Sequence, residues 1–105
     1  MSFLAIYITN PDASTAKTVS RHLLDKKLVA CANILPITSM YWWKGEQTET
    51  NEVVTLVKTT QQYWEAVQNE VKKIHPYEVP CIMKMHVEAN AEYEAWIQEQ
   101  VTRIS

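Results

Sequence analysis

Two long extended runs, joined by the only glycine of the chain, constrain the fold more than any other feature. Residues 28–43 and 46–59 are rich in β-branched and aromatic residues, and Lys44-Gly45 separates them. A short connection that ends in glycine predicts a β-hairpin, because glycine readily adopts the positive φ of tight turns. Strands of about 14–16 residues reach about 50 Å at about 3.3 Å per residue. Since a domain of this size has a radius of gyration of about 13 Å, we expect the hairpin to overhang its own domain.

The outer half of this hairpin is apolar on one strand and polar on the other. Pro36 interrupts the first strand and predicts a bulge, a bend or a sheet edge, because proline has no amide hydrogen for a ladder. Large apolar side chains follow it, whereas residues 46–52 opposite are polar. Exposed apolar patches mark interfaces, so we expect self-association. The alternative is a hairpin bent back at Pro36 onto its own core. The predicted interface residues are Ile37, Met40, Tyr41, Trp42 and Trp43.

The remaining segments alternate between strand and helix patterns. Short oxygen side chains before the apolar helical repeats are expected to cap the first turns. The expected elements are a strand over residues 3–9, a helix from Asp12 or Ser14 to Lys27, a helix from Thr60 to Ile74, a strand over residues 79–88 and a helix from Asn90 to Ile104.

The order β-α-β-β-α-β-α predicts the fold class. Right-handed crossovers around a central hairpin give an α+β fold, a ferredoxin-like βαββαβ sandwich with an antiparallel sheet. The long hairpin arm and an extra C-terminal helix complete it. No internal repeat or linker is visible, and we interpret residues 1–105 as a single domain.

Composition excludes several function classes. Dinucleotide loops, Walker-type phosphate loops and glycine-built nucleophile elbows need several glycines, and this chain has one. A net charge of −2 does not favour nucleic acid as a partner. No nucleophile with an obvious base emerges, so no enzyme is expected. Glu49 and Glu52 fit exposed hairpin charges better than catalytic acids.

Targeting signals and cysteines predict a location. The N-terminus has no basic segment of a signal peptide, and no apolar run approaches the roughly 20 residues of a membrane helix. Cys31 and Cys81, 50 positions apart, are expected to be reduced, buried small hydrophobes in a cytoplasmic protein. Met83 and Met85 alternate with Cys81. We expect them to line the core; a soft site for Cu(I) is the alternative.

Five strings of the sequence resemble one known family. They are A-C-A-N-I-L-P at 30–36, S-M-Y-W-W-K-G-E at 39–46, L-V-K-T-T at 56–60, H-P-Y-E-V-P at 75–80 and Y-x-x-W at 93–96. In this order they resemble the CutA divalent-cation tolerance family over nearly the whole chain. The resemblance implies a ferredoxin-like fold, a tight homotrimer whose hairpins join sheets between subunits, and an architecture similar to PII signal-transduction proteins. It also implies a role in tolerance of divalent metals, notably copper.

The resemblance also implies a metal site that this chain carries only in part. Family members described as copper binders have a cysteine near the end of the first strand and two histidines before Pro-Tyr. Those positions hold Thr9, Ile74 and His75 here. His75 is therefore the one candidate ligand for copper or another divalent cation. The alternative is a histidine whose imidazole complements the end of a helix.

A cleft between strand ends is the second candidate site. Lys58, Tyr77, Glu78 and Trp43 are expected to line it together with His75, between subunits in a trimer. The predicted function is a trimeric, cytoplasmic, non-enzymatic divalent-cation tolerance protein that responds to metal ions. The alternatives are a PII-like small-ligand sensor, or an enzyme that uses His75, Tyr77 and Lys58 in the cleft.

Overall fold

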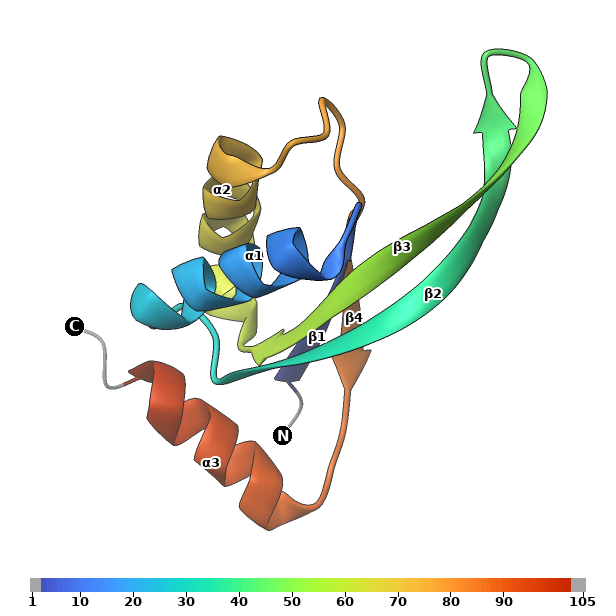
Figure 1. Ribbon diagram of the computed structural model, residues 1–105. Helices are drawn as coiled ribbons and strands as arrows, with labels where there is room; N and C mark the ends of the chain where they lie inside the picture. The colour runs from blue at the N-terminus through green and yellow to red at the C-terminus, as the bar shows by residue number, and fades with distance from the viewer. Residues whose placement is uncertain (1–2, 103–105) are drawn as a thin grey trace.

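The structure is a computed structural model that describes residues 3–102. Its strands and α-helices follow one another in the order that the sequence predicts (Figure 1). The elements are β1 (Phe3–Asn10), α1 (Ala13–Asp25), β2 (Cys31–Trp43), β3 (Glu46–Thr59), the 3-10 turn η1 (Gln61–Tyr63), α2 (Trp64–Ile74), β4 (Ile82–Val87) and α3 (Ala91–Thr102).

The four strands form one antiparallel sheet in the order β2-β3-β1-β4. Two crossovers, β1-α1-β2 and β3-α2-β4, interlock in this order, which is the ferredoxin-like arrangement. Figure 1 shows α1 and α2 on one face of the sheet and α3 at one end. The predicted α+β fold with an extra C-terminal helix is confirmed.

Alternate side chains of β1 build the core between the sheet and the two helices. Leu4, Ile6 and Ile8 are fully buried and pack in one cluster with apolar residues of both helices. The helix residues of this cluster are Val19, Leu23, Val67 and Val71. Burial of each such side chain contributes about 1.5–3 kcal/mol.

Helix α1 has defined ends. The Asp12 carboxylate accepts the Thr15 N–H at 2.7 Å, so Asp12 rather than Ser14 is the cap. At the other end Lys27 has φ 57°, and the Leu28 N–H donates to the Leu23 carbonyl at 3.0 Å. This pattern is a Schellman motif with lysine where glycine is usual.

Three predicted boundaries are wrong. The first strand of the hairpin was predicted from residue 28, but β2 begins at Cys31. The segment after Thr60 begins as η1 rather than α-helix, and the Thr60 side chain makes no capping bond. Strand β4 begins at Ile82 rather than Val79, because prolines at 76 and 80 keep the preceding segment out of the ladder.

The β2–β3 hairpin extends far beyond the sheet. Strand β1 pairs with β3 only as far as Asn10 opposite Val53, and residues 37–52, here called the arm, pair only within the hairpin. The register is unbroken across Pro36, which lies on edge strand β2, so the prediction of an edge is confirmed. Lys44 and Gly45 have φ of 52° and 81°, as in a type I′ turn.

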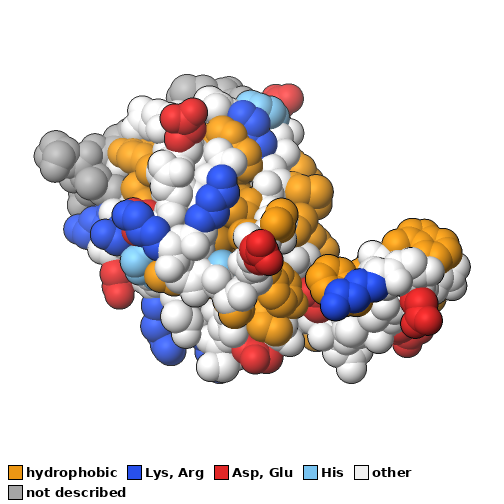
Figure 2. Space-filling model, turned by 90° about the horizontal axis from the view of Figure 1, so that it is seen from above, with side chains coloured by type: hydrophobic (Ala, Val, Ile, Leu, Met, Phe, Trp, Pro, Cys, Tyr) orange, Lys and Arg blue, Asp and Glu red, His pale blue; other side chains and the backbone are white. Residues whose placement is uncertain are grey.

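The overall dimensions confirm the overhang. The chain measures 45 × 26 × 21 Å and its radius of gyration is 14.4 Å, above the value of about 13 Å for a compact domain of this length. Figure 2 shows the arm standing apart from the body. The alternative of a hairpin bent back onto its own core is therefore wrong for the single chain.

Candidate functional site

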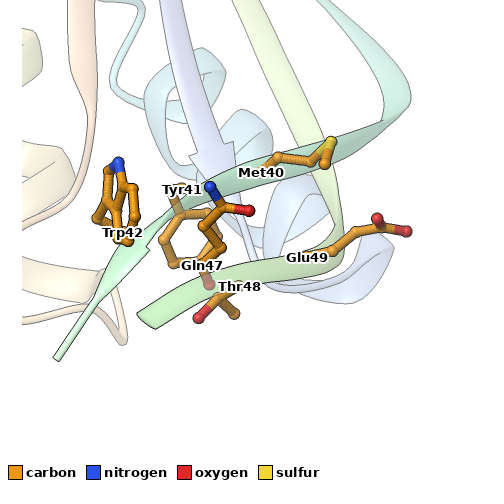
Figure 3. A pocket seen from close by; sticks show the side chains of 6 residues that line it. All are labelled: Met40, Tyr41, Trp42, Gln47, Thr48 and Glu49. Atoms are coloured by element: carbon orange, nitrogen blue, oxygen red, sulfur yellow. The ribbon is translucent and has the colours of Figure 1, made fainter. Parts of the chain in front are cut away.

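Of the described residues, the arm carries the most exposed aromatic side chains. Met40, Trp42 and Trp43 are 73%, 70% and 60% exposed, and Ile37 at the base of the arm is half-buried. Side chains from both strands of the arm line a shallow pocket of about 360 Å³ (Figure 3). Its lining residues are Met40, Tyr41, Trp42, Gln47, Thr48 and Glu49. The arm therefore offers an apolar surface with a polar border, as interfaces do.

A second apolar surface lies on the sheet face opposite α1 and α2. Among the side chains that strand register places on this face are five large ones that are not buried, here called the open face: Tyr7, Leu35, Leu56, Met83 and Met85. Leu35 and both methionines are exposed. The prediction that these methionines line the core is wrong for the single chain, because α1 and α2 form the core on the other face.

The two cysteines are unpaired and half-buried rather than buried as predicted. Cys31 begins edge strand β2, which has no neighbour on one side, and Cys81 lies just before β4. Neither position is enclosed by the core between the sheet and the helices.

His75 is held by both ring nitrogens. Its Nε2 lies 2.9 Å from the Thr9 carbonyl oxygen, and its Nδ1 accepts the Tyr77 N–H at 3.1 Å. Since a carbonyl can only accept, Nε2 carries the hydrogen and the imidazole is neutral. The side chain is buried, with 9% of the residue exposed.

These contacts do not fit a copper site of the kind that the resemblance implies. A metal ion needs a free imidazole lone pair, and the lone pair of Nδ1 is engaged by the Tyr77 N–H. Ile74 offers no donor atom. Within residues 3–102 no group of three or more His, Cys, Asp or Glu side chains could hold a metal ion.

Tyr77 connects this region to the arm. Its hydroxyl donates to Glu52 Oε2 at 2.7 Å, and its ring lies 4.9 Å from the His75 ring. Burial, and then the Glu52 carboxylate, raise the pKa of Tyr77 well above 10. The next residue, Glu78, is exposed.

Lys58 lies in a different environment. Its ammonium donates to Asn33 Oδ1 and lies 5.9 Å from the centre of the Tyr93 ring. The Tyr93 hydroxyl is 3.4 Å from Cys31 Sγ, and this contact, followed by burial, raises the pKa of Tyr93 to about 12. Tyr93 also stacks on Trp96, which accounts for the Y-x-x-W spacing.

One chain brings only part of the predicted cleft together. His75, Tyr77 and Glu52 are in contact, whereas Lys58 is six positions further along β3 and Trp43 is at the tip of the arm. Six positions along a strand correspond to about 20 Å. A cleft that contains all of the predicted residues needs a second chain.

Fold, arm and motif positions agree with one family. The profile of the CutA1 divalent ion tolerance protein family matches residues 4–100. The chain belongs to this family.

Individual relatives match over almost the full length. The divalent-cation tolerance protein CutA of Pyrococcus horikoshii is 36% identical over 101 residues, covering 95% of this chain and 99% of its own. The CutA of Archaeoglobus fulgidus is 41% identical over 97 residues, covering 91% and 95%.

Solved CutA structures share the fold. The structure described as periplasmic divalent cation tolerance protein CutA from Archaeoglobus fulgidus has a TM-score of 0.89 and 40% identity, covering 96% of this chain and 99% of that chain. CutA1 from Oryza sativa has a TM-score of 0.90 and 30% identity, covering 95% and 93%.

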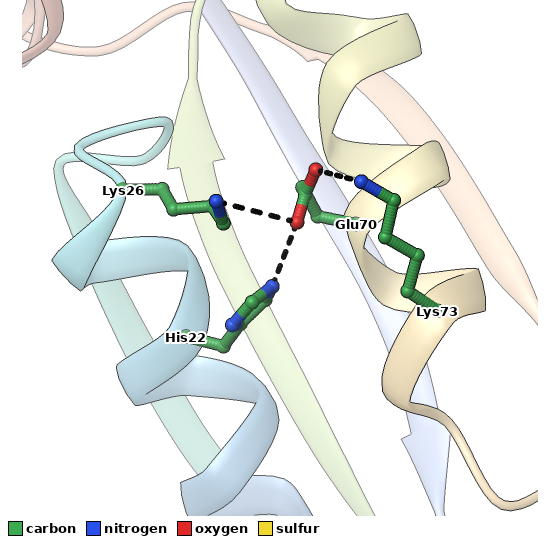
Figure 4. Close-up of polar contacts among 4 residues, drawn as sticks. All are labelled: His22, Lys26, Glu70 and Lys73. Atoms are coloured by element: carbon green, nitrogen blue, oxygen red, sulfur yellow. Dashed lines mark hydrogen bonds and ion pairs between the residues drawn. The ribbon is translucent and has the colours of Figure 1, made fainter.

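Sequence reasoning missed an ionic cluster between the two helices. Glu70 of α2 accepts from His22 of α1 at 2.8 Å and from Lys73 at 2.9 Å, and Lys26 lies 3.8 Å away (Figure 4). The hydrogen bonds from Lys73 and then His22 lower the pKa of Glu70 from 4.5 to about 2. The spacing of Glu70 and Lys73 was a visible signal, whereas the contact with α1 depends on helix packing. Because the cluster joins side chains of α1 and α2, we interpret it as a contact that stabilises the packing of these helices.

Proposed function

We propose that this CutA1 family member assembles as a homotrimer and acts, without catalysis, in the cellular response to divalent cations. One observation carries the proposal: Trp42 and Trp43 project into solvent from an arm that its own chain leaves uncovered. Large exposed apolar patches mark protein interfaces.

A ring of subunits is the assembly that suits these surfaces. The arm and the open face are different surfaces of one chain, so an arm that docks on the open face of the next chain makes a heterologous contact. Such contacts form a ring when the rotation between successive subunits closes. Within residues 3–102, β2 and β4 are the edge strands, each paired on one side only, and they can accept further strand pairing. The proposed number of subunits, three, is taken from the family resemblance.

Light scattering at micromolar concentration tests the proposal. The wild-type protein is expected at three times the 12.2 kDa chain mass. The double variant Trp42→Glu, Trp43→Glu is expected to shift toward the single-chain mass, because two charges would be buried in the contact. Leu24→Glu is the matched control, since Leu24 is exposed on α1 away from both surfaces. An unchanged mass in the double variant contradicts the proposed role of the arm.

We further propose that the response to divalent cations does not depend on a copper ion held by His75. The support is the engagement of both ring nitrogens of His75. Calorimetric titration with Cu(II), with Cu(I) under reduction and with Zn(II) tests this. The wild-type protein and His75→Ala are expected to give the same binding heats. Micromolar binding that His75→Ala abolishes contradicts the proposal.

A small-ligand site between subunits is the second candidate function. The observation that favours it is the Lys58 ammonium beside Asn33 and Tyr93, next to edge strand β2. An ammonium in that position suits an anionic ligand, and Tyr77, Glu78 and Trp43 would come from a neighbouring chain. Titration of the trimer with ATP and with citrate, compared with Lys58→Ala, tests this function. Binding that Lys58→Ala leaves unchanged contradicts it.

A cytoplasmic location completes the proposal. Its support is the presence of two free thiols, Cys31 and Cys81, because free thiols are typical of proteins in reducing compartments. Among the described helices, none has the length and apolar character to cross a membrane. Cell fractionation with antibody detection tests the location; recovery outside the cytoplasmic fraction contradicts it.

A further inference from the structure

The arm leaves the sheet at a single place on β3. Going along β3 toward the tip of the arm, Val53 is the last residue that pairs with β1, and Glu52 is the first that pairs only with β2. A two-stranded ribbon without a third strand twists and bends more easily than a sheet. Contacts made by residues 52 and 53 are therefore well placed to influence the direction of the arm.

Two side chains reach this place from outside the hairpin. Asn10 at the end of β1 is fully buried and donates from Nδ2 to the Val53 carbonyl at 3.0 Å. Tyr77 donates from its hydroxyl to the Glu52 carboxylate at 2.7 Å. A hydrogen bond to a charged carboxylate is stronger than one to a neutral carbonyl, so the Tyr77–Glu52 bond is the stronger of the two.

Tyr77 belongs to residues 75–81, here called the strap, which connects α2 to β4. Figure 1 shows this connection passing beside the point where β1 runs into α1. His75 fastens the strap to the Thr9 carbonyl, and the Tyr77 N–H bonds back to the His75 ring. The contact with Glu52, the last residue of the arm, and the contact with the adjacent Val53 thus both depend on the C-terminal end of β1.

The electrostatics keep the Tyr77 contact intact at neutral pH. Burial and Glu52 raise the pKa of Tyr77, so its hydroxyl stays protonated and can donate. Asp12 and Tyr41 act on Tyr77 in the same direction. Burial and Glu52 also raise the pKa of Cys81 at the far end of the strap, so this thiol stays neutral.

We propose that the strap is a conformational device that sets the direction of the arm through the chain of contacts Thr9–His75–Tyr77–Glu52. The inference rests on the proposed function, because the direction of the arm decides where it meets a second copy of the chain. His75 acts here as a positioning residue, and its neutral ring links the strap to β1.

Hydrogen–deuterium exchange of the arm amides tests the strap. Tyr77→Phe removes the hydroxyl and keeps the ring, so arm amides are expected to exchange about tenfold faster, since hydrogen bonds to charged groups are worth about that factor or more. Glu52→Ala is expected to have a similar effect, and the double variant no more than either single change. Tyr63→Phe is the matched control, because it removes a hydroxyl bond of 2.8 Å to the Val101 carbonyl at a distance from the arm.

The outcomes separate this inference from the proposed function. If hydrogen–deuterium exchange of the arm amides is unchanged in Tyr77→Phe, or is accelerated equally in Tyr63→Phe, the proposed role of the strap is wrong. Additive effects of Tyr77→Phe and Glu52→Ala also overturn it. A wild-type protein with the mass of one chain overturns the trimer, but the exchange comparison still decides the strap, because all of its contacts lie within one chain.

Discussion

Two lysines occupy backbone conformations that proteins usually give to glycine. Lys27 follows α1 with φ 57°, and Lys44 precedes Gly45 in the arm turn with φ 52°. In a residue with a Cβ, the left-handed region costs about 1–2 kcal/mol. The sequence identified the turn through Gly45, but lysine carries no signal for a positive φ, so these two positions could not be predicted.

Replacement of Lys27 by glycine is expected to stabilise the protein. Lys27→Gly relieves the left-handed strain at the end of α1 and keeps the two backbone bonds of the motif, so the free energy of unfolding is expected to rise by about 1 kcal/mol. Urea titration followed by circular dichroism measures it. Lys17→Gly, within α1, is the control and is expected to lower the same free energy by about 1 kcal/mol. A loss of stability in Lys27→Gly contradicts the assignment of backbone strain to Lys27.

Only some residues of the candidate site could be predicted from the sequence. The H-P-Y-E-V-P string identified His75 and Tyr77, and their positions after a helix are as predicted. Their partners, the Thr9 carbonyl and the Glu52 carboxylate, are 66 and 25 positions away and meet them only because β1 and β3 are neighbours. No local pattern contains that pairing.

At the scale of elements, periodicity predicted the strands, helices and their order. Hydrophobic alternation and the hairpin were sufficient because only a few topologies satisfy them. Boundaries beside prolines and the start of α2 were wrong, since backbone bonding there depends on tertiary contacts. The open face was missed because a strand pattern shows which residues share a face, and does not show which face the helices cover.

The contact between α1 and α2 is expected to depend on pH through Glu70. Its pKa is lowered from 4.5 to about 2 in the folded protein, so its contribution is fully present above about pH 4.5 and is lost as the pH falls toward 2. Glu70→Gln is therefore expected to unfold at lower urea than the wild type at pH 7. The difference should narrow between pH 4.5 and 2, and also at high salt. A difference that is the same at pH 7 and pH 2.5 contradicts this role of Glu70.

At the scale of the whole molecule, the single chain leaves two apolar surfaces exposed. Helices α1 and α2 cover one face of the sheet, and Tyr93 of α3 contacts Phe3 at one end of the other face. The tryptophans of the arm and the methionines of the open face remain exposed. Such surfaces reduce solubility unless a partner buries them, and a second copy carries both surfaces. The length and apolar pattern of the arm indicated this from the sequence, whereas the open face became visible only in the structure.

Native mass spectrometry of the wild-type protein at one micromolar, in reducing buffer, tests the central claim most directly. The account predicts one dominant species of three chains, because the arms and open faces of neighbouring copies cover one another. A dominant species of one chain would contradict it, since Trp42 and Trp43 would then remain exposed in the functional protein.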